Sequence, residues 1–193
     1  KEGIIGIKEK NMKAIDAFKK VLDDGMRLHL LGDFYPSGDE FILVYEATKR
    51  LIPPQGIPLH IGVVVNNVET FYNVALAAED KSVTEKFITV SGAVKNPITC
   101  VVPVGTPFSD VIEMAGGASV DDFGIFVSGI MMGKLVFNLD EPITKTCAGL
   151  IVLPRTHKLI ERKDQPESSM HRIGKSACDQ CSYCTELCPR YIL

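Results

Sequence analysis

Four cysteines near the C-terminal end are the residues whose spacing most clearly indicates chemistry in this chain. Cys178, Cys181, Cys184 and Cys188 are followed by Pro189, so the run reads C-x2-C-x2-C-x3-C-P. This is the ligand spacing of bacterial [4Fe–4S] sites, in which three thiolates bind one cluster and the fourth binds a second cluster. We therefore expect Cys178, Cys181 and Cys184 to bind one cluster, with a remote fourth ligand, and Cys188 to bind another.

The remote ligand and the nature of the metal leave alternatives open. Cys100 and Cys147 stand alone in β-type segments, and either could supply the fourth thiolate. We expect instead a second C-P run beyond Leu193. A zinc site made of all four cysteines is possible, although zinc ligands usually come as two separated C-x2-C pairs. A disulfide framework fits worse, because thiols so closely spaced pair poorly and nothing in the sequence indicates secretion.

Composition limits the class of protein that surrounds this run. The chain has 193 residues, 46% of them apolar, which is enough for one ordinary core or two small ones and excludes disorder. Its 21 basic and 24 acidic side chains give a net charge of −3, so no large cationic surface for nucleic acid is expected. No apolar window is long enough to span a bilayer. We expect an intracellular protein and, since the chain opens at Lys1 without a methionine, a fragment of it.

The first 85 residues alternate between helix and strand signals, which predicts an α/β domain. Apolar residues recur every three or four positions up to Gly25, as on one face of a helix that ends there. A second helix is expected to end before Pro53 and Pro54. A β-branched run, IGVVV, is typical of a buried parallel strand. The expected elements are helices over 11–24, 38–51 and 66–79 and strands over 26–32 and 61–65.

From residue 86 the pattern changes to short β-type runs separated by glycine, proline and asparagine. This predicts a small α+β unit over residues 86–153. Residues 154–177 are polar and charged, as in a surface linker, and residues 178–193 hold the cysteine run. Within the α+β unit the expected strands are 88–94, 98–104, 123–129 and 134–138, and the expected helix is 108–117.

Two short segments of the α/β part indicate a function only when their order in the chain is considered. YPSGDE, at residues 35–40, reads as a turn with an acidic helix start, and NNVET, at residues 66–70, reads as an asparagine-capped helix. The middle unit resembles the soluble-ligand-binding β-grasp (SLBB) module. The whole order resembles the flavin-binding 51-kDa subunit of NADH:quinone oxidoreductase and its relatives, the Rnf complex C subunit and the propanediol-utilisation cobalamin reductase.

This resemblance implies flavin-site residues at the matching positions. Tyr35, Gly38, Asp39 and Glu40 match the family's Y-x-x-G-E-E segment beside the flavin ring and the nicotinamide, with Asp39 in place of the usual glutamate. The family's glycine-rich loop, which cradles the FMN phosphate, has no match before Tyr35, so this fragment is expected to hold half a flavin site and to bind FMN weakly or not at all. The N-N-x-E-T segment that holds FMN matches Asn66, Asn67 and Thr70.

The resemblance also implies a fold and an activity. The fold class is α/β for a partial flavin-binding domain, followed by a small α+β SLBB domain and the start of a ferredoxin-like cluster region. The intact protein is expected to be an NADH-dependent oxidoreductase with FMN and two [4Fe–4S] clusters, and this fragment is expected to be inactive alone. Cys188-Pro189 argues against the 51-kDa subunit, and the segment CDQCSYCTELCPRYIL resembles the cobalamin reductase more closely than the Rnf subunit.

The expected partners follow from the same relatives. They are NADH and a redox acceptor, either a protein or cobalamin with its adenosyltransferase. The expected location is the cytoplasm or a bacterial microcompartment. Association with a membrane complex or a microcompartment complex is also expected. The SLBB module is expected to serve as a spacer or docking module, with a small-ligand site as its alternative. The competing class for the whole chain is a docking module stabilised by zinc. A catalytic thiol at Cys100 or Cys147 is a third reading, which lacks any Cys/His constellation.

Overall fold

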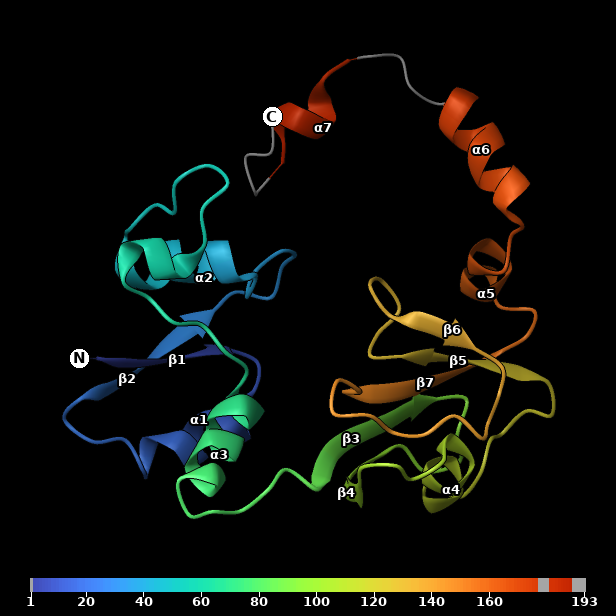
Figure 1. Ribbon diagram of the computed structural model, residues 1–193, viewed down its shortest axis with the longest axis horizontal. Coiled ribbons are helices and arrows are strands. Elements are labelled where there is room, and N and C mark those ends of the chain that lie inside the picture. The colour runs from blue at the N-terminus through green and yellow to red at the C-terminus, as the bar shows by residue number, and fades with distance from the viewer. Residues whose placement is uncertain (1, 177–180, 189–193) are drawn as a thin grey trace. The chain divides into compact units, whose positions relative to one another are not determined.

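Figure 1 shows the computed structural model of the chain, in which residues 2–176 and 181–188 are described. The chain divides into two compact units. Unit 1 contains residues 1–67 and 179–193, and unit 2 contains residues 68–178. Each unit has its own β-sheet, with two strands in unit 1 and five in unit 2 among the described residues. The mixture of helices and strands agrees with the predicted α/β and α+β composition.

Unit 1 is built on a parallel pair of strands joined by a helix. Strand β1 (Gly3–Lys8) runs beside β2 (Met26–Leu31), and α1 (Met12–Lys19) connects them (Figure 1). Parallel strands require such a crossover, because a tight turn can join only antiparallel neighbours. The strands and the helices α1 and α2 bury Ile7, Ile15, Leu31 and Val44, and Pro58 is buried as well.

Helix α2 (Glu40–Thr48) packs closely on this strand pair. A Cβ added at Gly6 of β1 would lie 2.7 Å from Leu43 Cδ1, so the glycine makes room for the helix. Arg27 of β2 donates to the carbonyl oxygen of Ala47 at 2.7 Å. The helix ends at Lys49, which has a φ of 60°, so it stops earlier than the expected stop before the prolines.

Two predictions for unit 1 were wrong. Ile61–Val65 is not a strand: a short 3-10 helix, η1 (Pro58–Ile61), ends at Gly62, and residues 63–67 are irregular with Val64 62% exposed. An apolar β-branched run does not specify a strand unless a neighbouring strand edge is there to pair with it. Helix α1 also ends at Lys19, well before Gly25. Its last turn is closed by the Lys20 and Val21 N–H groups, each of which donates to a carbonyl oxygen three residues earlier.

Unit 2 contains a five-stranded mixed sheet in the order β4-β3-β7-β5-β6. Strands β3 and β7 pair in parallel, and the other neighbours are antiparallel. The four strands and the helix that the sequence predicted here are all present, whereas β7 was not predicted. The elements are α3 (Val68–Ala77), β3 (Glu85–Gly92), β4 (Ile98–Pro103), α4 (Phe108–Met114), β5 (Phe123–Val127), β6 (Lys134–Val136) and β7 (Gly149–Pro154).

The core of unit 2 lies between one face of this sheet and α4. Helix α4 contributes Phe108, Val111 and Ile112, all buried, and β3 contributes Ile88 and Val90. The alternation of buried and exposed residues along β3 is the period-2 pattern of a strand that is buried on one face. Burial of this row against the helix is what holds the SLBB-like unit together.

Two helices occupy the segment that we expected to be a linker. Helix α5 (Lys158–Lys163) buries Ile160, and α6 (Glu167–Ser176) follows it. The Arg155 guanidinium pairs with Asp164, at the C-terminal end of α5, at 3.0 Å. Polarity alone did not reveal these helices, because a mostly exposed helix and a surface linker have similar compositions. In the part of the chain that is described, no helix has the length and apolarity needed to cross a bilayer.

Candidate functional site

The YPSGDE segment forms the loop that leads into α2 in unit 1. Tyr35 is 78% exposed, and Gly38 has a φ of 94°, a conformation that favours glycine. Asp39 caps the helix, and its carboxylate accepts a hydrogen bond from the Phe41 N–H at 3.0 Å. Glu40 is the first helical residue and is half-buried. The structure therefore brings all four predicted residues together at one helix N-terminus.

This loop contains a polar atom for which the described residues supply no partner. The Ser37 Oγ is inaccessible to solvent and makes no hydrogen bond within the described chain. Buried hydroxyls are nearly always hydrogen-bonded, so an unsatisfied one calls for a ligand, a water or a partner. A flavin offers carbonyl, ring-nitrogen and ribityl hydroxyl groups that pair with such donors. On this observation the residues of the loop fit FMN.

The NNVET segment contains the boundary between the two units along the chain. Asn66 and Asn67 are exposed at the end of unit 1, and Thr70 is exposed in the first turn of α3, in unit 2. Exposed amides offer both donors and acceptors to a ligand. The three predicted residues remain close in sequence, but they are divided between separately described units.

Glu69, which the resemblance did not single out, has the most extensive contacts of this segment. Its carboxylate pairs with the Lys86 ammonium of β3 and also accepts a hydrogen bond from the Phe87 N–H at 3.3 Å. The Tyr72 ring meets the Phe87 ring edge-on, with 5.9 Å between centroids. A sequence signal for this was available: Lys86 precedes Ile88 and Val90 at the period of the buried row, where an apolar residue is expected.

The cysteine run is described in part. Cys178 lies outside the described residues, and so does Pro189. Cys181 is exposed, Cys184 is exposed within α7 (Tyr183–Glu186), and Cys188 is half-buried just after that helix. Over residues 2–176 and 181–188, no three His, Cys, Asp or Glu side chains are grouped to hold a metal ion. The donor set itself, thiolates at ferredoxin spacing, fits an iron–sulfur cluster, and the ligand assignment stays a prediction.

The two remaining cysteines belong to the core of unit 2. Cys147 is buried, with Sγ 3.8 Å from the Gly149 carbonyl oxygen, and Cys100 is half-buried, with Sγ 3.8 Å from the Ile88 carbonyl oxygen. Burial raises the pKa of both thiols above their ordinary value. Because the thiolate is the nucleophile and the metal ligand, these surroundings favour a structural role for both.

We predict a clear order of thiol reactivity in the native chain. Cys147 should react with a maleimide at least about tenfold more slowly than Cys181, because its thiol is buried and stays protonated. Its neutral form stabilises the fold below the ordinary thiol pKa, and this stability is lost as the pH rises through the raised pKa. Mass spectrometry of partially labelled protein measures both rates. Equal rates in the native chain would contradict the burial, and equal rates in denaturant are the control.

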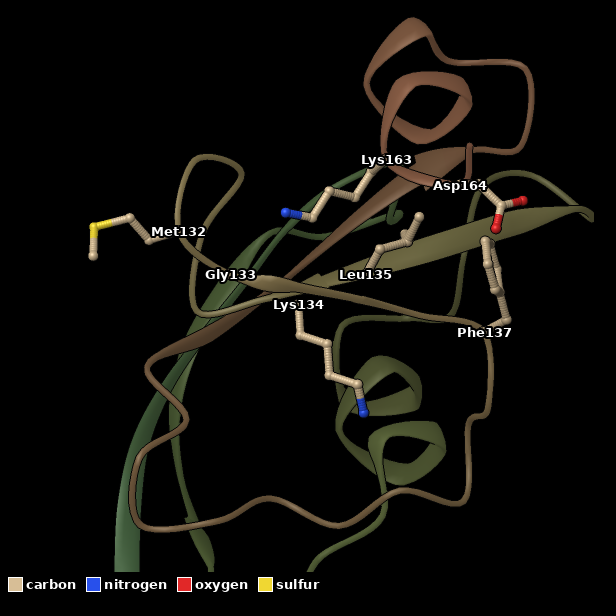
Figure 2. A pocket seen from close by; sticks show the side chains of 7 residues that line it. All are labelled: Met132, Gly133, Lys134, Leu135, Phe137, Lys163 and Asp164. Atoms are coloured by element: carbon tan, nitrogen blue, oxygen red, sulfur yellow. The ribbon is translucent and has the colours of Figure 1, made fainter. Parts of the chain in front are cut away.

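Unit 2 also has a pocket of about 350 Å³ beside the β5–β6 hairpin and α5 (Figure 2). The figure shows Leu135 and Phe137 beside the Lys163 and Asp164 side chains, whereas Lys134 points away from them. The Arg155 guanidinium stacks 3.7 Å from the Phe137 ring centroid and engages Asp164, so part of the wall is already paired.

Comparison with known families defines the class of protein. Residues 1–76 match the Nuo51 FMN-binding domain, and residues 87–124 match the SLBB domain. The chain is therefore similar to part of a Nuo51-type FMN-binding domain followed by an SLBB domain. This confirms the resemblance drawn from YPSGDE, NNVET and the β-grasp segment.

Within this class the chain is homologous to two kinds of protein. It is 47% identical, over 100% of its length, to the cobalamin reductase PduS of Salmonella typhimurium, and 33% identical, over 99%, to the C subunit of the proton-translocating ferredoxin:NAD(+) oxidoreductase complex of Clostridium ljungdahlii. It spans 43% and 40% of those proteins, less than half of either. A crystal structure of an NAD+-reducing [NiFe]-hydrogenase shares the fold, with a TM-score of 0.63 at 21% identity over 81% of this chain and 34% of that one.

Proposed function

We propose that the protein is an electron-transfer flavoprotein that passes electrons from NADH through FMN to [4Fe–4S] clusters and on to cobalamin. The observation that carries this proposal is the 47% identity to a cobalamin reductase along the whole chain, which includes both the flavin segments and the cysteine run. The whole protein would then be an NADH-dependent oxidoreductase, of which this chain supplies part of the flavin site, the SLBB domain and the first cysteine run.

The flavin would be held by the residues named from the sequence. Asn66, Asn67 and Thr70 would bind FMN, and Tyr35, Gly38, Asp39 and Glu40 would border its ring and the nicotinamide. When bound, FMN accepts two electrons from NADH and can release them one at a time. The Asp39 cap holds the loop against α2, and the Gly38 backbone gives the loop its sharp turn. The Ser37 hydroxyl, buried without a partner among the described residues, would donate to a flavin acceptor once its neighbours make room for the ligand.

The cluster would be held by the thiolates of Cys178, Cys181 and Cys184 with a remote fourth ligand. Cys188 would ligate a second cluster, as the fourth cysteine does in two-cluster proteins. The protein's own contribution is to place the thiolates, to bury them and to donate hydrogen bonds to sulfur, which together set the reduction potential. The half-buried Cys188 and the exposed Cys184 differ in these surroundings.

A second acceptor is supported by a specific similarity. The chain is 33% identical over 99% of its length to the C subunit of a ferredoxin:NAD(+) oxidoreductase complex. In that case the electrons would pass to or from a membrane-bound redox partner instead of cobalamin. Reduction of cob(II)alamin by the full-length protein with NADH tests the choice directly. A rate no higher than that of free FMN would favour the second acceptor.

FMN binding by the full-length protein is the first test of the proposed function, because this chain alone is expected to bind FMN weakly or not at all. Wild-type protein should quench FMN fluorescence saturably, and Asn67→Ala should raise the Kd about tenfold, the value of one hydrogen bond of about 1–1.5 kcal/mol. Asn138→Ala is the matched control, since Asn138 caps a turn in unit 2 through its bond from the Asp140 N–H and should leave the Kd unchanged. Absence of saturable quenching by the wild type would contradict the proposal.

A further inference from the structure

Lys86 is an unusual residue for its position. It is 9% exposed, and it is the one charged side chain classed as buried in the described part of the chain. It occupies the same face of β3 as Ile88 and Val90, which form the core of unit 2. A buried ammonium group is costly unless it is paired and hydrogen-bonded. Its partner is the Glu69 carboxylate of α3, itself 22% exposed.

Glu69 also completes the hydrogen bonding of β3 at an edge that no strand covers. Pairing of β3 with β7 begins at Thr89 and Gly149, and the Thr89 N–H donates to Ala148. The Phe87 N–H, two residues earlier and therefore on the same edge, lies beyond that pairing. It donates instead to the second carboxylate oxygen of Glu69. One side chain of α3 thus satisfies both a buried cation and a backbone donor of the sheet.

These contacts fix the first turn of α3 to the SLBB sheet. Glu69 immediately precedes Thr70, the flavin residue that α3 carries, and both belong to unit 2. The edge-on contact of Tyr72 with Phe87 adds a second attachment one turn further on. Thr70 is exposed whereas Glu69 contacts the sheet, because consecutive residues of a helix point about 100° apart around its axis. The ion pair therefore controls where Thr70 and the start of the helix are held.

We propose that Lys86 is a positioning residue for the flavin segment: through Glu69, the SLBB domain holds the first turn of α3 in the orientation that binds FMN. This inference rests on the proposed function. It assigns the SLBB domain a task in flavin binding beyond that of a spacer. In this proposal the glutamate of NNVET, Glu69, contacts the sheet and not the ligand. FMN is bound by its neighbours Asn66, Asn67 and Thr70.

The test breaks the pair in the full-length protein and measures two things separately: how firmly α3 is held and how tightly FMN binds. Lys86→Met removes the cation with little loss of volume, and Glu69→Gln is the milder break, because its amide oxygen can still accept from Phe87. Hydrogen exchange of the Phe87 amide should accelerate at least about tenfold in Lys86→Met, and the Kd for FMN should rise about tenfold in both variants. The exchange rate and the Kd are both measured under conditions in which circular dichroism shows that each variant is fully folded. Lys81→Met, which breaks the exposed pair with Glu79, should change neither.

Each outcome decides a different point. A lower melting temperature with an unchanged Kd would make the pair merely structural and would overturn the inference. Unchanged exchange at Phe87 in Lys86→Met would overturn the anchoring itself. If the wild type binds no FMN, the proposed function fails, and the exchange rates still decide whether the pair holds α3 on the sheet. The result we expect is faster exchange in Lys86→Met, a higher Kd in both Lys86→Met and Glu69→Gln, and neither change in Lys81→Met.

Discussion

Replacement of Cys184 by alanine should abolish the [4Fe–4S] absorption and the reduced-cluster EPR signal of the chain after anaerobic reconstitution with iron and sulfide. The motif gives this thiolate to the same cluster as Cys178 and Cys181, and a cluster that already needs a remote fourth ligand cannot tolerate the loss of another. Cys184 is exposed in α7, so its truncation removes no core contact. The expected effect is complete loss of bound cluster with the fold unchanged.

The matched control is Cys100→Ala. Cys100 is half-buried against the core of unit 2, and burial raises its thiol pKa, so it should not ligate a cluster. The variant should retain the full iron content and the EPR signal of the wild type. Loss of the cluster in Cys100→Ala would identify Cys100 as the remote ligand. Retention of the cluster in Cys184→Ala would contradict the assignment of the run.

Substitution of Gly92 by alanine should be among the most destabilising single changes in unit 2. Gly92 ends β3 with a φ of 87°, and a Cβ there would lie 2.1 Å from the Val152 carbonyl oxygen of β7. The left-handed backbone costs an alanine about 1–2 kcal/mol, and overpacking adds about 1–3 kcal/mol. We expect a loss of about 2–5 kcal/mol in the free energy of unfolding, measured by urea denaturation.

Gly105→Ala separates the two contributions. Gly105 has a φ of 101°, but a Cβ there meets no atom within 4 Å. This variant should therefore lose only the backbone contribution, about 1–2 kcal/mol. Equal losses at the two positions would show that the close approach of β3 and β7 at Gly92 does not limit stability.

The sequence predicted the SLBB unit better than the flavin unit, for a physical reason. Strand β3 alternates between buried and exposed residues, β3 and β4 are bounded by Gly, Pro and Asn, and the buried side chains of both pack on a core within the same unit. In unit 1 the run Ile61–Val65 has the composition of a strand but does not join the two-stranded sheet of β1 and β2. Composition reports what a segment prefers, whereas pairing depends on what lies beside it.

The candidate site shows the same division. YPSGDE and the cysteine spacing could be found from residue order, because a capped helix and a cluster loop are local structures. The pairing of Glu69 with Lys86 could not, since it joins residues 17 apart on different elements. The one hint was a lysine in the buried row of β3. When a lysine occupies a core position, its acidic partner should therefore be sought among nearby residues first. Only then should a glutamate in a motif be assigned to ligand binding.

Metal analysis and low-temperature EPR of the wild-type chain, reconstituted anaerobically with iron and sulfide and reduced with dithionite, test the central claim most directly. The claim is that the cysteine run binds an iron–sulfur cluster that can receive electrons from the flavin. It predicts a brown protein with broad visible absorption, iron and sulfide in stoichiometric amounts, and a reduced-cluster signal. A colourless protein that retains stoichiometric zinc and gives no such signal would contradict it and would favour a zinc-stabilised docking module.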